Sequence, residues 1–370
     1  MSLTPKSPAH VLMTTDTVGG VWTYALDLAR GLLLADVRVT LAVLGPPPSA
    51  AQALAAQSLD GLNLVVTGLP LDWLADGPDA VVQAGRRLAA LASDIRADMV
   101  HLNSPALAAK AQFAQPVLGA CHSCLATWWD AAGSGAFPKR LQWRVKLQGE
   151  GYRACDILIA PSRAFAQATA ATYPGVQPRI VYNGRPLPLS PPEGEREACA
   201  VTTGRLWDAG KNLAVLDRAA ALMTHPVFAI GSRLSPDGEQ AQASHVQLLG
   251  AVAPSAVAAR LARSKVFVSL ALYEPFGLAV LEAGQAACAL VLADNPTFRE
   301  LWSDAAVFVD PRAPDAAAAQ MNELLNDAEK SAAWGAAAQR RARRYTTAAM
   351  IDGTLAAYAA IAQREKARVA

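Results

Sequence analysis

Apolar runs of strand length alternate with longer helical segments along the whole chain, and this alternation constrains the fold more than any other feature. In the first half the strand-length runs lie at 10–15, 37–45, 62–69, 99–103, 116–122 and 156–162. The segment between the first two runs places Leu26, Ala29 and Leu33 on one helical face. Strands that alternate with helices in this way predict parallel sheets covered by helices.

The same pattern restarts after a proline-rich piece at 185–192, which we interpret as an interdomain linker. The second series of strand-length runs lies at 198–204, 226–232, 245–250, 265–272 and 289–295. At 370 residues the chain is long enough for two domains that each bury a core. We therefore expect an α/β protein with two Rossmann-like parallel-sheet domains facing each other across a cleft, at 1–184 and 185–347, and a separate terminal helix at 348–370.

Composition excludes several classes of protein. Hydrophobic residues make up 52% of the chain and charged residues 17%, which predicts a globular protein. A net charge of +2 gives no overall electrostatic case for nucleic acid as a partner. No apolar run reaches the length of a bilayer span and residues 1–10 lack the apolar core of a secretory signal, so we expect a cytoplasmic protein. Five scattered cysteines argue against a disulfide framework; Cys121 and Cys124 are ordinary cysteines or, alternatively, a redox pair.

The stretch YEPFGLAVLE at 273–282 places two carboxylates eight residues apart across a predicted loop-to-helix junction. Glu274 would precede the helix and Glu282 would lie inside it. The amides of Phe276, Gly277 and Leu278 would then fall in the first helical turn, where unpaired N–H groups and the helix dipole favour a phosphate. Both glutamates can accept hydrogen bonds from sugar hydroxyls. This pattern predicts a site that binds a phosphate and a polyol together.

Two further segments follow predicted strands at the points where parallel sheets bind ligands. In TTGRLWDAGKNL at 202–213, Arg205 and Lys211 are two cations suited to a diphosphate, or alternatively a solvated face. In DTVGGVWTY at 16–24, Gly19 and Gly20 would let the backbone wrap an anionic group, or would form a plain strand-to-helix turn. Neither segment contains the G-x-G-x-x-G fingerprint of dinucleotide-binding proteins.

Together these segments resemble the retaining, nucleotide-sugar-dependent glycosyltransferases of the GT-B fold, family four. Glu274 and Glu282 match the family's E-x7-E signature, and Arg205 and Lys211 match the basic pair that binds the nucleotide's phosphates. The resemblance covers nearly the whole chain. It implies that the first domain receives the acceptor, the second binds the nucleotide sugar, and the terminal helix returns to the first domain.

The resemblance also implies roles for residues that are weak signals alone. His122 matches the strand-end histidine that contacts the donor sugar and phosphate, although a lone histidine is more often structural. His101 and Asn103 end another strand and could line the acceptor side. Asn183, followed by glycine, resembles the family's V-x-N-G segment and predicts a turn, and Glu300 resembles a residue that supports the site.

One departure from the family lies after the E-x7-E helix. The family often has C-G-x-P-V there, whereas this chain has AACALVLA, with Cys288 and Ala289 in that stretch. The turn at this point is therefore expected to differ in shape.

The resemblance implies a mechanism without a metal, a cofactor or a covalent intermediate. No D-x-D pair follows a predicted strand, which fits the metal-independent habit of GT-B enzymes. Arg205, Lys211 and the helix start near Gly277 would stabilise the departing diphosphate. Attack on the same face as the leaving group would retain the anomeric configuration. Glu274 is then assigned to sugar hydroxyls and Glu282 to the nucleotide ribose.

Two other functions stay open at the level of the sequence. A GT-B sugar-nucleotide epimerase would share the fold but act without an acceptor, and a non-catalytic subunit would bind a sugar nucleotide without turnover. The segment FPKRLQWRVKLQ at 137–148 mixes basic and aromatic residues. It suggests a lipid-linked acceptor and peripheral contact with the inner face of a membrane, or else a solvated helix face. The resemblance itself implies a glycan, lipid-linked or small-molecule acceptor.

Overall fold

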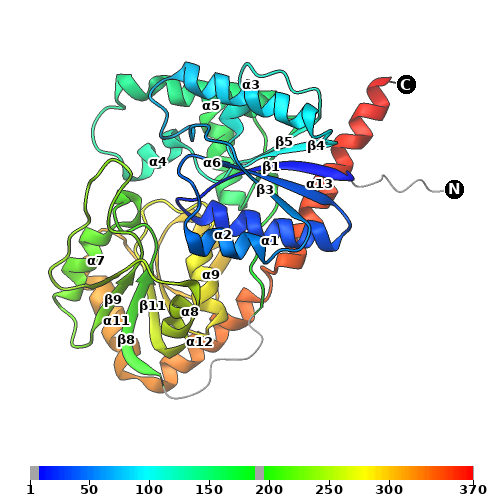
Figure 1. Ribbon diagram of the computed structural model, residues 1–370. Helices are drawn as coiled ribbons and strands as arrows, with labels where there is room; N and C mark the ends of the chain where they lie inside the picture. The colour runs from blue at the N-terminus through cyan, green and yellow to red at the C-terminus, as the bar shows by residue number, and fades with distance from the viewer. Residues whose placement is uncertain (1–7, 188–195, 370) are drawn as a thin grey trace. The chain divides into compact units, whose positions relative to one another are not determined.

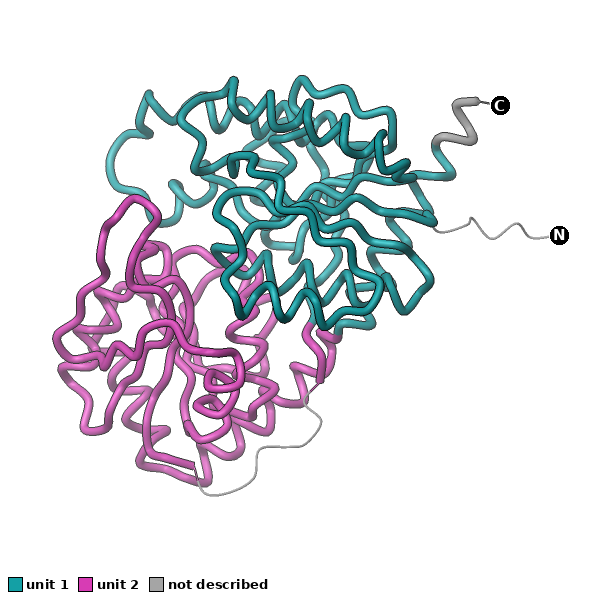
Figure 2. The backbone as a smooth tube through the Cα atoms, in the orientation of Figure 1, with its two compact units in different colours: residues 1–184, 347–370 teal, residues 185–346 magenta. Residues whose placement is uncertain are grey.

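The computed structural model describes residues 8–187 and 196–369, and its contacts divide the chain into two compact units. Unit 1 comprises 1–184 together with 347–370, and unit 2 comprises 185–346 (Figure 2). Each unit is built on its own parallel sheet, with seven strands in unit 1 and six in unit 2 within the described residues. Part of the proline-rich linker, 188–192, lies outside the described residues. The predicted α/β architecture with two Rossmann-like sheets is confirmed.

The sheet of unit 1 has the strand order β3-β2-β1-β4-β5-β6-β7, with every neighbouring pair parallel (Figure 1). Its strands are β1 (His10–Asp16), β2 (Arg38–Leu44), β3 (Leu62–Val66), β4 (Met99–Leu102), β5 (Val117–Ala120), β6 (Ile157–Ala160) and β7 (Arg179–Ile180). The first strand sits centrally, with Val11 in register with Val39 on one side and Met99 on the other. The carboxyl ends of β1, β4 and β5 therefore share one edge.

Helices cover both faces of this sheet. They are α1 (Gly20–Leu34), α2 (Ala50–Gln57), α3 (Pro78–Asp94), η1 (Pro105–Ala108), α4 (Leu125–Ala132), η2 (Lys139–Leu141), α5 (Gln142–Ala154), α6 (Arg163–Thr172) and α13 (Thr347–Val369). One core cluster joins α1 and α13 to the strands, and a second joins α3, η1 and α5 to them.

The terminal helix α13 belongs to the core of unit 1, although more than 160 residues of unit 2 precede it in the chain. Met350, Tyr358 and Ile361 are almost fully buried in the cluster that also contains Leu28 and Leu32 of α1. Burial of such side chains stabilises a fold by roughly 1.5 to 3 kcal/mol each, so α13 is a substantial part of this core.

The sheet of unit 2 has the order β10-β9-β8-β11-β12-β13, also parallel throughout. Its strands are β8 (Glu197–Thr203), β9 (Val227–Ile230), β10 (Gln247–Gly250), β11 (Ser264–Ser269), β12 (Ala289–Ala293) and β13 (Val307–Val309). Its helices are η3 (Ala209–Lys211), α7 (Leu213–Ala220), α8 (Pro254–Arg263), α9 (Leu278–Gln285), α10 (Pro296–Trp302), α11 (Pro314–Asn326) and α12 (Ala328–Ala342).

The strand-length runs of the sequence correspond to strands in every case, usually shortened by one to three residues. Two strands, β7 and β13, were not predicted, because runs of two and three residues carry too little apolar periodicity.

The predicted turn at Asn183 is wrong, because the residues after β7 form irregular backbone without an assigned turn. Within the described residues, no helix is both long enough and apolar enough to cross a membrane.

Candidate functional site

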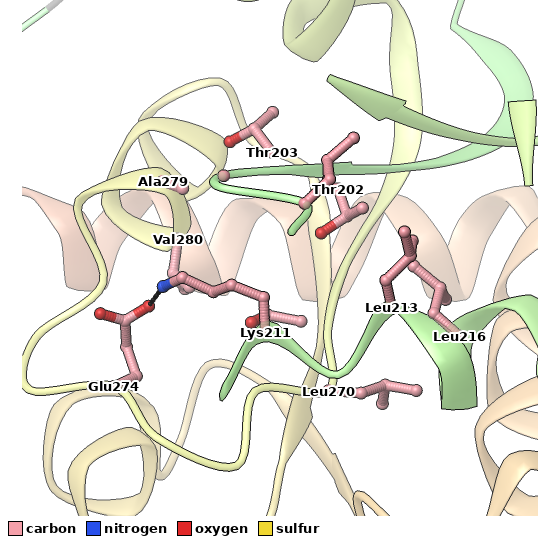
Figure 3. A pocket seen from close by; sticks show the side chains of 12 residues that line it. Thr202, Thr203, Lys211, Leu213, Leu216, Leu270, Glu274, Ala279 and Val280 are labelled. Carbon is pink, nitrogen blue, oxygen red and sulfur yellow. Dashed lines mark hydrogen bonds and ion pairs between the residues drawn. The ribbon is translucent and has the colours of Figure 1, made fainter. Parts of the chain in front are cut away.

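A pocket opens at the carboxyl edge of the sheet in unit 2, where β8 and β11 end side by side (Figure 3). It is lined by Thr202, Thr203, Gly204, Leu206, Lys211, Leu213, Leu216, Ser269, Leu270, Glu274, Ala279 and Val280. The first turn of α9 forms part of the wall, through Ala279 and Val280. Open parallel sheets bind ligands at such edges because strand ends and helix starts converge there.

Lys211 and Glu274 meet inside this pocket. The Nζ of Lys211 lies 2.5 Å from Oε2 of Glu274, and Figure 3 shows the two side chains extended toward each other. Their side chains are 24% and 14% exposed, so water screens the pair only partly. The sequence placed both residues in one site, and the structure brings them together. An ammonium and a carboxylate held at one wall can serve a diphosphate and a sugar hydroxyl respectively.

The backbone before α7 holds Lys211 in place. Asp208 accepts a hydrogen bond from the backbone N of Gly210 at 2.9 Å and so caps the short helix η3. Asn212 follows with a φ of 60°, and its side-chain Nδ2 donates to the carbonyl oxygens of Leu270 and Pro311 at 2.9 and 2.7 Å. Asparagine tolerates this left-handed conformation better than most residues. Lys211 is thus fixed between two anchored neighbours.

Arg205 does not line the pocket, in contrast to its predicted partner Lys211. Its Nη2 pairs with Oδ2 of Asp208 at 2.8 Å, and its guanidinium lies 5.6 Å from the ring centre of Trp207. The Arg205 side chain is 38% exposed. A second cation is therefore available near the strand end, but Asp208 already neutralises part of its charge.

The helix after Glu274 begins two residues later than the sequence suggested. Leu278 is its first residue, Gly277 is the N-cap with a φ of 91°, and Phe276 lies before the helix. The expectation that the amides of Phe276 and Gly277 belong to the first turn is wrong. Gly277 takes a backbone conformation that side chains disfavour, which ends the loop and starts α9 abruptly. The ring of Phe276 is buried and packs edge-on against Tyr345, with ring centres 5.6 Å apart.

Glu282 lies inside α9, as predicted, but outside the residues that line the pocket. Its Oε1 is 3.0 Å from Nε of Arg185, and both side chains are between one fifth and one third exposed. The backbone N of Arg185 also donates to the carbonyl oxygen of Tyr345 at 3.2 Å. Sequence reasoning missed Arg185 because it fell within the presumed linker, and only its place two residues after Asn183 hinted at a role.

The turn after α9 lies in the stretch that departs from the family pattern. Ala287 has a φ of 55°, the conformation that glycine adopts most readily. The backbone N of Cys288 donates to the carbonyl oxygen of Ala283 at 3.0 Å, which closes the helix end. Alanine thus occupies a backbone position that suits glycine. Glu300 lies on α10, in the middle of that helix.

In unit 1 the predicted glycines occupy the start of α1. Gly19 is the N-cap and Gly20 the first helical residue, directly after the carboxyl end of β1. No side chain of the described residues caps this helix at Gly19. Asp16 accepts a hydrogen bond from the backbone N of Val18 at 2.8 Å and shapes the turn. The structure places the glycine loop at the same sheet edge as the ends of β4 and β5.

His122 and Asn103 are joined at that edge. Nε2 of His122 lies 2.8 Å from Oδ1 of Asn103, and the ring of Tyr24 packs against the imidazole with centres 4.5 Å apart. Burial lowers the pKa of His122 to about 4, so the imidazole is neutral at pH 7. Asn183 is also buried, at 7% exposed, and lies one residue before Gly184, where the first segment of unit 1 ends.

His101 is buried completely, so its predicted role at a ligand surface is not supported by its position. Its Nδ1 lies 2.7 Å from the hydroxyl oxygen of Tyr358 on α13. Burial, with a smaller contribution from nearby His122, lowers the pKa of His101 to about 3. This histidine links the terminal helix to β4 in its neutral form.

Some side chains of the basic segment 137–148 contact other parts of unit 1 and are not exposed. Arg144 donates to the carbonyl oxygens of Asp72, Trp73 and Ala75, and Trp143 packs against the core cluster of α3. The remaining basic residues are exposed, namely Lys139, Arg140 and Lys146. Only these three of the segment's four basic side chains are therefore exposed to bind an acceptor or a membrane surface.

The cysteines are free thiols, and Cys121 and Cys124 are buried. The Cys121 Sγ donates to the hydroxyl oxygen of Tyr152 at 2.8 Å, and burial raises its pKa to about 12. Buried thiols of this kind are inert, which favours the interpretation of ordinary core cysteines. Within 8–187 and 196–369, no three His, Cys, Asp or Glu side chains are grouped as metal ligands would be.

The fold and this site agree with two family models. Residues 18–187 match the model described as Glycosyltransferase Family 4, and residues 238–341 match Glycosyl transferases group 1. Together the two matches span most of the chain. The protein therefore belongs to the group 1 glycosyltransferases. No curated protein sequence matches the chain.

Solved structures of the same GT-B fold are similar over nearly the whole chain. A sucrose-phosphate synthase from Thermosynechococcus elongatus has a TM-score of 0.77 at 15% identity and covers 98% of this chain and 100% of its own. HepE from Anabaena, solved in complex with UDP-glucose, has a TM-score of 0.71 at 19% identity, covering 97% and 99%. TarM from S. aureus, solved with UDP, has a TM-score of 0.71 at 11% identity, covering 95% and 99%.

Proposed function

We propose that this glycosyltransferase moves a hexose from a nucleoside diphosphate sugar to a glycan, lipid-linked or small-molecule acceptor, without a metal and with retention of configuration. Unit 2 would bind the donor and unit 1 the acceptor. The observation that carries this proposal is the Lys211–Glu274 pair in a pocket at a strand end beside the start of α9. The solved complexes of similar proteins with UDP and UDP-glucose support a UDP-type donor, with a GDP-type donor as the other candidate.

The site supplies what departure of a diphosphate needs. Negative charge develops on the leaving group, and positive charge fixed in advance stabilises it. Lys211 provides a full charge and the first turn of α9 a partial one. Arg205 provides a second, more exposed charge at the same strand end. Glu274 would accept hydrogen bonds from the sugar, and Glu282 from the ribose.

A panel of sugar nucleotides tests this function directly. The full chain, with EDTA in excess, is incubated with UDP-, GDP- and ADP-sugars, with and without a mixture of saccharide acceptors. Release of the nucleoside diphosphate is measured. We expect acceptor-stimulated release from one nucleotide class and no loss in EDTA. Conversion of the sugar without any acceptor would identify an epimerase, and activity restored only by magnesium or manganese would reject the metal-independent mechanism.

A further inference from the structure

Hydrogen bonds link Thr14, Asn103 and His122 at the carboxyl edge of the sheet in unit 1. The donors and acceptors in this chain can be assigned from the chemistry of the groups. The backbone N of Asn103 donates to Oγ1 of Thr14 at 2.9 Å, and its side-chain Nδ2 donates to the carbonyl oxygen of Thr14 at 2.6 Å. A carbonyl oxygen only accepts hydrogen bonds, so the NH₂ group of the Asn103 amide must face Thr14. The amide oxygen of Asn103 must then face His122.

This orientation determines which nitrogen of His122 carries a hydrogen. The Oδ1 of Asn103 can only accept, and Nε2 of His122 lies 2.8 Å away, so Nε2 must be protonated. The imidazole is neutral, because burial lowers its pKa to about 4. The other nitrogen, Nδ1, is therefore bare, and it forms no hydrogen bond within the described part of the chain. The Tyr24 ring packs at 68° to the imidazole and restricts its rotation.

We propose that Asn103 is a positioning residue that holds His122 in the Nε2–H tautomer, so that Nδ1 accepts a hydrogen bond from a substrate hydroxyl. The hydroxyl as ligand rests on the proposed function, whereas the tautomer does not. A phosphate oxygen also accepts hydrogen bonds and cannot pair with a bare nitrogen. Of the two contacts that the family resemblance implies for His122, this geometry selects the one to the sugar. In many protein sites the hydrogen bond to one ring nitrogen of a histidine sets the tautomer, and so the role of the other nitrogen.

Nitrogen NMR tests the tautomer without any ligand. Long-range ¹H–¹⁵N spectra of the ¹⁵N-labelled full chain at pH 7 distinguish a protonated ring nitrogen from a bare one, and His122→Gln assigns the signals. We expect a protonated Nε2 and a bare Nδ1 in the wild type, and an average of both tautomers in Asn103→Ala. The control is Asn63→Ala, since Asn63 donates to Thr40 elsewhere in unit 1 and should leave His122 unchanged. A protonated Nδ1 in the wild type, or an unchanged tautomer in Asn103→Ala, would overturn the proposal.

A second variant covers the case in which the alanine variant fails to fold. In Asn103→Asp the carboxylate still accepts from Nε2–H, and its charge favours the imidazolium, so NMR titration should show a raised pKa for His122. An unchanged pKa would mean that residue 103 does not face His122. With a sugar nucleotide that the wild type turns over, Asn103→Ala should lower kcat/KM about tenfold, the scale of one hydrogen bond. Its affinity for the nucleoside diphosphate should be unchanged. Failure to find such a donor would reject the proposed function and leave the tautomer result standing.

Discussion

The carboxyl edges of the two sheets differ in the kind of polar group that they hold. In unit 2 the groups at the edge are charged and paired, with Lys211 on Glu274 and Arg205 on Asp208. In unit 1 the two imidazoles are neutral, because burial lowers the pKa of His101 to about 3 and that of His122 to about 4, while the carboxylate of Asp16 lies in the turn after β1. Charges suit an ionic leaving group, and neutral donors and acceptors suit hydroxyl groups. Under the proposed function, the charged edge of unit 2 would bind the diphosphate and the histidine edge of unit 1 would bind hydroxyl groups.

The largest expected effect comes from removing the charge of Glu274. Glu274→Gln keeps the size of the side chain but weakens its acceptance from sugar hydroxyls, so turnover should fall on the order of a hundredfold. It also frees the Lys211 ammonium, so affinity for the nucleoside diphosphate should stay equal or rise. Steady-state kinetics and calorimetry on one preparation separate the two parameters. Loss of nucleotide binding with normal turnover of bound donor would reverse the roles of the two glutamates.

Acid should destabilise the protein because the unfolded chain takes up a proton on His101 that the buried imidazole in unit 1 does not. The folded pKa of His101 is about 3, below the unfolded value near 6.5, so between these values the unfolded chain binds a proton that the folded chain does not. The stabilisation is complete above about pH 6.5 and declines as pH falls, by about 1.4 kcal/mol per pH unit for one fully titrating group.

Urea unfolding at pH 6.5 and pH 5 measures this slope. In His101→Gln the fall in stability should be smaller than in the wild type, since the titrating group is gone. His225→Gln, on the surface of unit 2, is the matched control and should keep the wild-type slope. Identical slopes in all three proteins would show that His101 is not held neutral.

Arg205→Ala tests how much the positive charge of Arg205 contributes to nucleotide affinity. Because Asp208 pairs with Arg205 and the side chain is 38% exposed, we expect a loss of nucleotide affinity of only about 1 kcal/mol, smaller at high salt. Calorimetric titration at low and high salt measures it. A loss as large as that of Lys211→Ala would mean that Arg205 turns toward the phosphates when the nucleotide binds.

The smallest effect is expected at the end of α9. Ala287 holds a left-handed conformation that costs an L-residue about 1 kcal/mol or more, which Ala287→Gly would relieve. Glycine also gains freedom in the unfolded chain, which offsets part of this gain. The variant should be more stable by less than about 1 kcal/mol, measured by urea unfolding. A clear loss of stability would show that the alanine methyl group is needed for packing.

The sequence predicted those parts of the molecule that depend on local pattern. Buried strands carry continuous apolar runs, so both sheets could be located, and Lys211 and Glu274 fell at strand ends that neighbouring strands bring together. Contacts between distant segments left no local signal. The His101–Tyr358 bond spans 257 residues, and the Arg185–Glu282 pair joins the presumed linker to a helix. The start of α9 was misplaced because a left-handed Gly277 can end a loop or lie within a turn.

Calorimetric titration of nucleoside diphosphates into the wild type, Lys211→Ala and Arg218→Ala tests the charged edge of unit 2 most directly. Arg218 is an exposed cation on α7, close in sequence to Lys211, and serves as the control for lost charge. The wild type should bind one of UDP, GDP or ADP, and Lys211→Ala should weaken that binding by roughly 1.5 to 3 kcal/mol, the scale of a charge-assisted hydrogen bond. Arg218→Ala should bind as the wild type does. Equal affinity in the wild type and Lys211→Ala would contradict the assignment of the diphosphate to this pocket.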